Sequence, residues 1–320
     1  MRTGTLGATG LRISRICLGT MLFGSVLDEQ ESHCLMETAL ALGINFFDVA
    51  NSYPSPPDPS TMGRTEEIVG RWLRGRRDSV VLSTKFGSKF HPLQGGRRDV
   101  IQACEESLRR LGTDRIDIYW FHQPTLATAF EETLEALDRL AEAGKILQLG
   151  VSNFEAWHLG VLLFQAGQRS GCRVAAVQPR YNLLYRQPER DLIPLAAAMG
   201  LGVVPFNPLG AGVLAGRYQR ADLPPADSRF TWGEFGRSYQ ERYWSDAAFE
   251  VADVVREVAT AEGLTSSQVA VAWLLSRKSV NSVIVGASRP GQLEDSAQGA
   301  DADLSSESLR ILEKASQGFI

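Results

Sequence analysis

The chain has 320 residues, of which 44% are hydrophobic and 22% are charged, and its formal net charge is −4 at pH 7. This composition is typical of a globular protein with a large core and excludes a chain that stays disordered for lack of apolar residues. The small negative charge gives no reason to expect nucleic acid or an anionic membrane as a partner.

The cysteines and histidines indicate neither disulfides nor a metal site. Cys17, Cys34, Cys104 and Cys172 are widely spaced and form no CxxC pair. Cys17 and Cys104 lie in apolar segments, as reduced core thiols do. The four histidines are scattered, so no metal is expected. The amino-terminal residues lack the apolar core of a signal peptide, and no segment is long enough to span a membrane, so we expect a cytoplasmic protein.

Hydrophobic periodicity predicts a regular alternation of strands and helices along the chain. Residues 3–14 favour a small β-hairpin. Short apolar runs then predict strands over residues 16–20, 45–49, 80–85, 116–122, 146–152, 175–179, 202–207 and 281–286. Helical patterns follow over residues 28–42, 65–74, 99–111, 130–143, 156–168, 190–199, 246–262, 290–298 and 305–315. A Gly-, Pro- and Arg-rich stretch before residue 244 is predicted to be irregular.

Eight strand–helix units predict a single (β/α)8 barrel over residues 1–320, with an N-terminal hairpin and extra C-terminal helices. The alternative is a doubly wound open sheet, which usually carries a Gly-rich fingerprint after its first strand. Here that position reads Gly19-Thr-Met-Leu-Phe-Gly24 and lacks the GxGxxG spacing. The pattern therefore favours the barrel.

Four polar side chains follow three neighbouring strands, at the end of the barrel where active sites of this fold lie. They are Asp48, Tyr53, Lys85 and His122. Taken singly, each has an ordinary explanation, such as a turn cap or a lysine at a strand end. Together they suggest acid–base chemistry. Lys85 would lower the pKa of Tyr53 and make it a proton donor, Asp48 would hold Lys85, and His122 would orient a substrate oxygen.

Seven segments carry a resemblance to a known family along nearly the whole chain. They are residues 43–53, 65–70, 82–85, 117–122, 144–153, 205–210 and 284–289, and they include Gly43-Ile-Asn-Phe-Phe-Asp48 and Gly144-Lys-Ile-Leu-Gln-Leu-Gly. The sequence resembles the aldo-keto reductases, in a branch with bacterial reductases and potassium-channel β-subunit-like proteins. The resemblance implies that Asp48, Tyr53, Lys85 and His122 form the catalytic tetrad. It also implies NADPH lying extended across the barrel mouth without a Rossmann domain.

The resemblance further assigns residues to each part of the cofactor. Ser152, Asn153 and Gln178 would hold the nicotinamide carboxamide, and Phe206 would stack on the ring. Asn207, Leu209, Gly212 and Arg217 would lie along the pyrophosphate, and Gly286, Ser288, Arg289, Gln292 and Asp295 at the 2′-phosphate and adenine. Gly19, Thr20, Met21 and Asp48 are also assigned to the cofactor. The fork of Arg289 suits a phosphate and favours NADP over NAD, although Asp295-Ser296 replaces a commoner Glu-Asn pair.

The expected reaction is reduction of an aldehyde or ketone by NADPH, with Tyr53 as the general acid. The chain ends soon after the last expected helix, which predicts an open pocket suited to bulky or sugar-like carbonyls. A long loop, residues 54–63, would reshape one wall, and further wall candidates are Met21, His91, Trp120, Trp232 and Trp244. Two alternatives stay open: a non-catalytic NADP-binding subunit that senses redox state, and a Schiff-base lyase using Lys85. A homo-oligomer also stays open.

Overall fold

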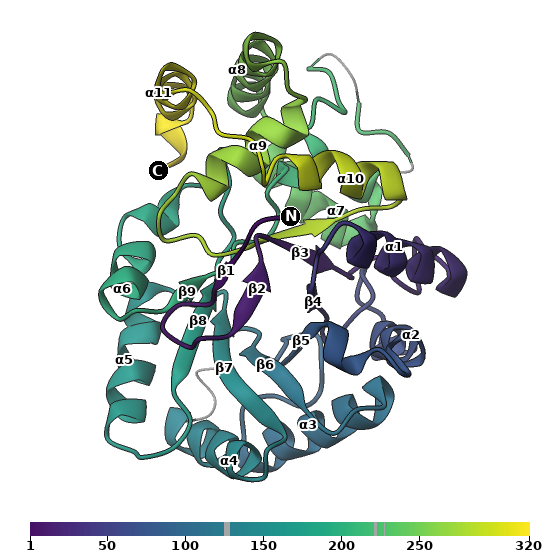
Figure 1. Cartoon of the computed structure of the whole chain (residues 1–320), viewed down its shortest axis with the longest axis vertical. Helices are drawn as coiled ribbons and strands as arrows, with labels where there is room; N and C mark the ends of the chain where they lie inside the picture. The colour runs from purple at the N-terminus through teal and green to yellow at the C-terminus, as the bar shows by residue number, and fades with distance from the viewer. Residues whose placement is uncertain (125–128, 221–222, 227) are drawn as a thin grey trace.

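In the computed structural model, which describes residues 1–124, 129–220, 223–226 and 228–320, eight parallel strands form one curled sheet (Figure 1). The strand order is β10-β3-β4-β5-β6-β7-β8-β9. The strands are β3 Ile16–Gly19, β4 Phe46–Asp48, β5 Val81–Phe86, β6 Ile116–Phe121, β7 Ile146–Ser152, β8 Val174–Gln178, β9 Gly202–Val203 and β10 Val283–Gly286.

The two edges of this sheet meet and close it. The amides of Asn281, just before β10, and of Ile284, within it, donate to the carbonyls of Val203 and Pro205, each at 2.9 Å. The closure confirms the predicted (β/α)8 barrel.

Helices surround the barrel. They are α1 Glu29–Ala41, α2 Arg64–Leu73, α3 Arg97–Leu111, α4 Phe130–Glu142, α5 Ala156–Gly167, α6 Leu192–Ala198, α7 Gly233–Tyr243, α8 Asp246–Glu262, α9 Ser266–Leu275, α10 Pro290–Gln298 and α11 Ser306–Ala315. The first begins where the sequence predicts, because Asp28 and Glu31 form a reciprocal capping box. None of the helices in the described ranges is long and apolar enough to cross a membrane.

The predicted N-terminal hairpin is present and covers the amino end of the barrel. Strand β1 (Thr3–Thr5) pairs antiparallel with β2 (Arg12–Ser14). Leu6 and Ile13 are fully buried and join the cluster inside the barrel. Gly7 has φ +49°, and a Cβ there would lie 2.5 Å from the amide nitrogen of Gly202, at the start of β9. The hairpin therefore packs directly against the sheet and leaves the carboxyl end as the open one.

The period of two along each strand decides which side chains face the barrel interior. Phe46, Val81, Ile118 and Trp120 pack in one interior cluster, whereas their neighbours Phe47, Leu82 and Tyr119 belong to the core shared with the helices. Continuing the same alternation toward the carboxyl ends brings polar residues inward. The interior is thus apolar at its centre and polar at one mouth.

Two helices were not predicted from the sequence, and one strand is shorter than expected. The stretch predicted to be irregular contains α7, whose Gly233 and Gly236 weaken its helical signal. Helix α9 is buried along Gln268–Leu274, so it has no polar face and no amphipathic period. The seventh strand ends at Val203 instead of Asn207, because Pro205 has no N–H for a ladder.

Candidate active site

The four residues of the predicted tetrad lie together at the carboxyl end of the barrel. Asp48 ends β4, Lys85 lies one residue before the end of β5, and His122 follows β6, and these strands are neighbours in the sheet. Tyr53 is on the loop after β4, with its hydroxyl 3.5 Å from Lys85 Nζ. The ring centroids of Tyr53 and His122 are 6.2 Å apart. The structure therefore brings all four side chains into one cluster.

Lys85 is the buried centre of this cluster. Its ammonium forms an ion pair with Asp48 Oδ2 and donates to the carbonyl of Val49 at 2.8 Å. The other oxygen of Asp48 accepts from Ser83 Oγ at 2.8 Å. Burial alone lowers the pKa of Lys85, but Asp48 and Tyr53 outweigh it and raise the pKa above its usual value. Lys85 is consequently charged at neutral pH and fixed in position.

The pKa of Tyr53 differs from the sequence-based expectation. Burial raises the pKa of Tyr53 above 10, and the attraction of Lys85 offsets this only in part. The predicted lowering of the tyrosine pKa is therefore wrong, because desolvation of the phenolate outweighs a long contact of 3.5 Å with Lys85. The phenol carries its proton at neutral pH, as a proton donor must.

His122 is neutral over the physiological pH range. Its amide donates to the carbonyl of Phe86 at 2.7 Å, which extends the pairing of β5 and β6 and fixes the backbone. Burial, with the charge of Lys85 adding to it, lowers the pKa of His122 to about 3. Its buried Nδ1 has no hydrogen-bond partner among the described residues. A neutral imidazole with an uncommitted nitrogen beside Tyr53 is suited to hydrogen-bonding a polar ligand.

The residues predicted to hold the carboxamide lie at the ends of the next two strands. Ser152 Oγ donates to the carbonyl oxygen of Gln178 at 2.9 Å and lies 3.3 Å from its Oε1. Gln178 Nε2 donates to Asp48 Oδ1 at 3.0 Å. Asn153 has φ +57° and donates from Nδ2 to the carbonyl of His122 at 2.9 Å. One hydrogen-bonded chain thus connects these amides to the tetrad.

The segment after β9 holds the residues predicted for the nicotinamide ring and pyrophosphate. Phe206 packs against the interior cluster and forms a parallel bridge with Ile284. Asn207 has φ +61°, and its side chain accepts from the amide of Ala211 at 3.0 Å, which shapes the turn. The remaining predicted residues, Leu209, Gly212 and Arg217, follow in this turn, with Leu209 half-buried and Arg217 exposed.

The loop after β10 leads into α10, where the phosphate and adenine residues were predicted. Gly286 is exposed, and Ser288 donates to Gln292 Oε1 from both its amide and its hydroxyl, at 2.9 and 3.0 Å. Arg289 is the exposed N-cap residue of α10. The carboxylate of Asp295 accepts from Thr265 Oγ1 at 2.8 Å and from Gln268 Nε2 at 3.0 Å. Its present contacts fix the start of α9.

The loop after β3 lies beside the tetrad and the long loop. Gly19 ends β3, and Thr20 Oγ1 donates to the carbonyl of Asp48 at 2.8 Å. The carbonyl of Met21 accepts from the amide of Ser55 at 2.9 Å. These bonds fasten the loop that follows Tyr53 to the rim of the barrel.

The comparison with protein families agrees with this geometry. A model of the aldo/keto reductase family matches residues 15–317. The chain belongs to the aldo/keto reductase family. Members of this family are oxidoreductases that act on small carbonyl substrates and generally use NAD(P)H.

Three similar proteins cover nearly the whole of this aldo/keto reductase. "Uncharacterized oxidoreductase YrpG" of Bacillus subtilis is 34% identical, over 96% of this chain and 93% of that protein. A protein of Oryza sativa subsp. japonica named as a probable voltage-gated potassium channel subunit beta is 32% identical, over 94% and 92% of the two chains. L-glyceraldehyde 3-phosphate reductase of Escherichia coli O157:H7 is 32% identical, over 91% and 85%.

Helix α7 adds aromatic residues to the mouth of this reductase that the sequence did not reveal. Phe235, Tyr239 and Tyr243 recur every four residues and so share one face. Phe235 packs edge-on against Phe90, from the loop after β5, with ring centroids 6.5 Å apart. Tyr243 accepts from Asn207 Nδ2 at 2.8 Å. The helix therefore bridges two loops of the mouth, and the spacing of its aromatic residues was the signal available in the sequence.

Of the other predicted wall residues, two are elsewhere. Trp120 is fully buried in the barrel interior, with its ring against Gly150. His91 is buried in its own loop and accepts from the amide of Leu93 at 3.1 Å. Trp232 stacks on Phe235 of α7, with ring centroids 6.4 Å apart.

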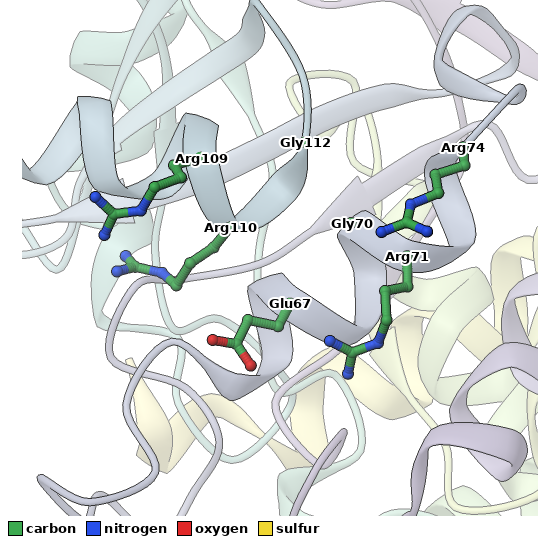
Figure 2. Close-up of a pocket in the computed structure, with 7 residues that line it drawn as sticks. All are labelled: Glu67, Gly70, Arg71, Arg74, Arg109, Arg110 and Gly112. Atoms are coloured by element: carbon green, nitrogen blue, oxygen red, sulfur yellow. The ribbon is translucent and has the colours of Figure 1, made fainter.

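A pocket of about 300 Å³ on the outside of the reductase is not part of this site (Figure 2). It is lined by Glu67, Gly70, Arg71, Arg74, Arg109, Arg110 and Gly112, from the carboxyl ends of α2 and α3. Cationic side chains at helix carboxyl ends complement the helix dipole. Arg71 also pairs with Glu29 and Arg110 with Glu66. Two of the four arginines are thus held by ion pairs within the chain.

Proposed function

We propose that this protein reduces the carbonyl group of an aldehyde or ketone to an alcohol, with NADPH as the reductant. The observation that supports this best is the buried Lys85, held by Asp48 on one side and 3.5 Å from the hydroxyl of Tyr53 on the other. Acid–base catalysis of carbonyl reduction needs a positioned proton donor next to the substrate oxygen. The tetrad supplies one.

Each member of the tetrad has a distinct role in this proposal. Tyr53 donates its phenolic proton to the carbonyl oxygen as the alcohol forms. Lys85 stabilises the phenolate that remains, and Asp48 keeps Lys85 charged and in place. His122, whose pKa of about 3 keeps it neutral, hydrogen-bonds the carbonyl oxygen and orients it toward Tyr53.

The residues around the mouth fit a nicotinamide dinucleotide. A bound reduced nicotinamide would supply the hydride that the carbonyl carbon accepts. Ser152, Asn153 and Gln178 offer amide and hydroxyl groups of the kind that bind a carboxamide. Arg289 is exposed at the amino end of α10, where helix dipole and guanidinium both favour an anion. This arrangement supports a 2′-phosphate there, and hence NADPH over NADH.

The substrate we propose is a small carbonyl compound, bulky or sugar-like. One relative of this chain is named as an L-glyceraldehyde 3-phosphate reductase, whose substrate is a three-carbon sugar phosphate. The aromatic face of α7 and the uncommitted nitrogen of His122 would offer an apolar wall and a polar contact to such a molecule.

Binding of both nucleotides, measured by fluorescence titration, tests the cofactor. We expect NADPH to bind more tightly than NADH, and Arg289→Ala to weaken NADPH at least tenfold, as expected for loss of a charge-assisted hydrogen bond. Arg74→Ala is the matched control, since Arg74 is an exposed arginine of the outer pocket. No binding of either nucleotide would overturn the proposal.

Turnover then tests the chemistry. Wild type is assayed with a panel of aldehydes, quinones and sugar ketones, and Tyr53→Phe serves as the inactive control. We expect the variant to bind NADPH normally and to lose activity by about 10² to 10⁴. Equal activity in the two proteins would remove Tyr53 from the mechanism.

A non-catalytic role is the second candidate, because one relative bears the name of a channel subunit. It predicts tight NADPH binding without turnover of any carbonyl in the panel. The Schiff-base lyase gains no support, because the raised pKa of Lys85 keeps the amine protonated and therefore not nucleophilic.

A further inference from the structure

Arg180 is a cation at the mouth of the barrel that belongs neither to the tetrad nor to the residues assigned to the cofactor. It follows β8 by two residues and forms a parallel bridge with Phe206. The amide of Phe206 donates to the carbonyl of Pro179 at 3.0 Å, so the pairing continues past the end of β8. Paired residues of neighbouring strands point to the same side of a sheet. Because Phe206 packs against the interior cluster, the side chain of Arg180 also starts from the inner side.

The alternation along β8 agrees with this direction. Ala176 belongs to the interior cluster, and Gln178 donates to Asp48 of the tetrad. Arg180 is the next residue on the same side, about 7 Å further along the strand toward the open end of the barrel. It is half-buried. Arg180 therefore lies on the wall of the mouth, one step above a residue that contacts the tetrad.

Stacking on an aromatic ring holds the guanidinium in place. Its central carbon lies 3.5 Å from the ring centroid of Tyr185. Tyr185 closes a turn in which its amide and that of Asn182 each donate to the carbonyl of the other, at 3.0 and 3.2 Å. The fully buried side chain of Asn182 donates to the carbonyl of Asn207 at 2.8 Å and so fixes the turn. The stacked guanidinium thus has a rigid support.

This stacking leaves the hydrogen-bonding capacity of Arg180 unused. A guanidinium that stacks through its face keeps its N–H donors free at its edge. Among the residues that the structure describes, Arg180 has no ion-pair partner and no acceptor for its side chain. Arg186, by contrast, donates two hydrogen bonds to the carboxylate of Glu189, at 2.8 and 2.7 Å. A fixed, half-buried cation without a counter-ion favours the binding of an anion.

The charge of Arg180 also acts on the aromatic face of α7. Burial raises the pKa of Tyr243, and the charge of Arg180 is the strongest of the effects that oppose this rise. The hydroxyl of Tyr243 accepts from Asn207 Nδ2 at the mouth. The positive field of Arg180 therefore covers the side of the mouth where α7 offers a wall to the substrate.

We propose that Arg180 binds an anionic group of the carbonyl substrate, a phosphate or a carboxylate, while the carbonyl itself lies at Tyr53 and His122. This inference rests on the proposed reduction and narrows its substrates to acidic carbonyl compounds. A rigid guanidinium binds either oxyanion through two N–H donors. Loss of such a charge-assisted contact corresponds to a preference of about ten- to hundredfold for the anionic compound over its neutral counterpart.

Two pairs of aldehydes test this inference in the NADPH-dependent assay: glyceraldehyde 3-phosphate with glyceraldehyde, and 4-oxobutanoate with butanal. Wild type is expected to show a kcat/KM at least about tenfold higher for the anionic member of one pair. Arg180→Gln should lose this preference and reduce the neutral members as wild type does, and Arg180→Lys should keep part of it. Arg173→Gln is the matched control, because Arg173 is exposed at the opposite end of the same strand, and should behave as wild type.

Three results would overturn the inference. No preference in wild type, or a preference that Arg180→Gln keeps, would show that the guanidinium does not bind the substrate. An equal loss of kcat/KM with all four aldehydes would assign Arg180 to packing on Tyr185. Weaker binding of NADPH by Arg180→Gln, measured by fluorescence titration, would assign it to the cofactor.

Calorimetric titration of glycerol 3-phosphate and of succinate, in the presence of NADP, separates this inference from the proposed reaction. Neither compound has an aldehyde or ketone group. Binding of either one to wild type and Arg173→Gln, but not to Arg180→Gln, would support the anion site even if no carbonyl were turned over, a result that would contradict only the reaction. Turnover of neutral carbonyls without such binding would overturn the anion site and leave the reaction in place.

Discussion

Gln178 donates its side-chain amide to Asp48 at 3.0 Å, so a residue at the end of β8 holds the carboxylate that positions the lysine of β5. The same side chain lies 3.3 Å from the hydroxyl of Ser152. A group predicted to bind the nicotinamide is therefore also part of the hydrogen-bond network of the tetrad. In the proposed cofactor assignment, occupation of that site and the position of Lys85 would be connected through this one amide.

This connection predicts different effects for two neighbouring substitutions. Gln178→Met removes the donor to Asp48 as well as a carboxamide contact, so we expect NADPH to bind five- to tenfold more weakly and kcat to fall. Ser152→Ala is the control, because it leaves every hydrogen bond to Asp48 in place. We expect it to weaken binding with little change in kcat. Fluorescence titration and steady-state kinetics separate the two, and an unchanged kcat in Gln178→Met would argue against the connection.

The Lys85–Asp48 ion pair predicts a large stability effect that depends on whether one charge or both are removed. Both side chains are almost fully buried, so Lys85→Met leaves a buried carboxylate without its counter-ion. We expect a loss of about 3–5 kcal/mol in the free energy of unfolding, measured with urea. The double variant Asp48→Asn/Lys85→Met removes both charges and should recover most of this loss. A double variant as unstable as the single one would show that packing of the lysine matters more than its charge.

His122 predicts an acid-dependent loss of stability. Its pKa is about 3 in the folded protein and about 6.5 in an unfolded chain, so the unfolded state binds the extra proton between these values. Stability is therefore lost as the pH falls below 6.5. The expected contribution is at most about 2 kcal/mol between pH 8 and pH 5.

Urea denaturation from pH 8 to pH 5 measures this contribution of His122. The free energy of unfolding of wild type is compared with that of His122→Asn at each pH. Asparagine is polar and does not titrate, so the difference between the two proteins should change by that amount over the range. If the free energies of unfolding of the two proteins changed in parallel with pH, His122 would be more hydrated than its surroundings suggest.

The sequence predicted the barrel and the tetrad because both rest on strong local patterns. Buried strands such as Ile116–Phe121 are short apolar runs, and parallel strands bring their carboxyl ends together whatever the loops do. The pKa of Tyr53 was not predictable in the same way. Its direction depends on how burial compares with a contact of 3.5 Å, and spacing along the chain fixes neither quantity.

The two helices that were not predicted, α7 and α9, have weak local sequence patterns. Helix α9 lost its periodic signal because it is buried on every side, and α7 because two glycines dilute it. Asp295 was predicted from its motif to bind the cofactor, but its present hydrogen bonds to Thr265 and Gln268 depend on a helix that the sequence did not reveal.

Helix α7 leads to the last prediction, which concerns the substrate. Tyr239 lies between Phe235 and Tyr243 on the face of α7 that bridges the mouth. Burial is the main cause that raises the pKa of Tyr53, and the charge of Tyr239 adds to it. Arg229 and Arg242 lie over its ring, 5.4 and 5.7 Å from the centroid, and hold it in place. We therefore expect Tyr239 to contact the carbonyl substrate rather than the nucleotide.

Tyr239→Ala should raise KM for the best carbonyl substrate about five- to thirtyfold, the effect of losing roughly 1–2 kcal/mol of aromatic contact. The dissociation constant of NADPH should not change. Tyr239→Phe keeps the ring and loses only the hydroxyl. If Tyr239 acts as an apolar wall, this variant should retain most of the affinity for the carbonyl substrate. If the hydroxyl binds the substrate, the variant should resemble Tyr239→Ala. Steady-state kinetics together with NADPH titration distinguish these results. An equal loss of NADPH affinity in Tyr239→Ala would instead assign α7 to the cofactor.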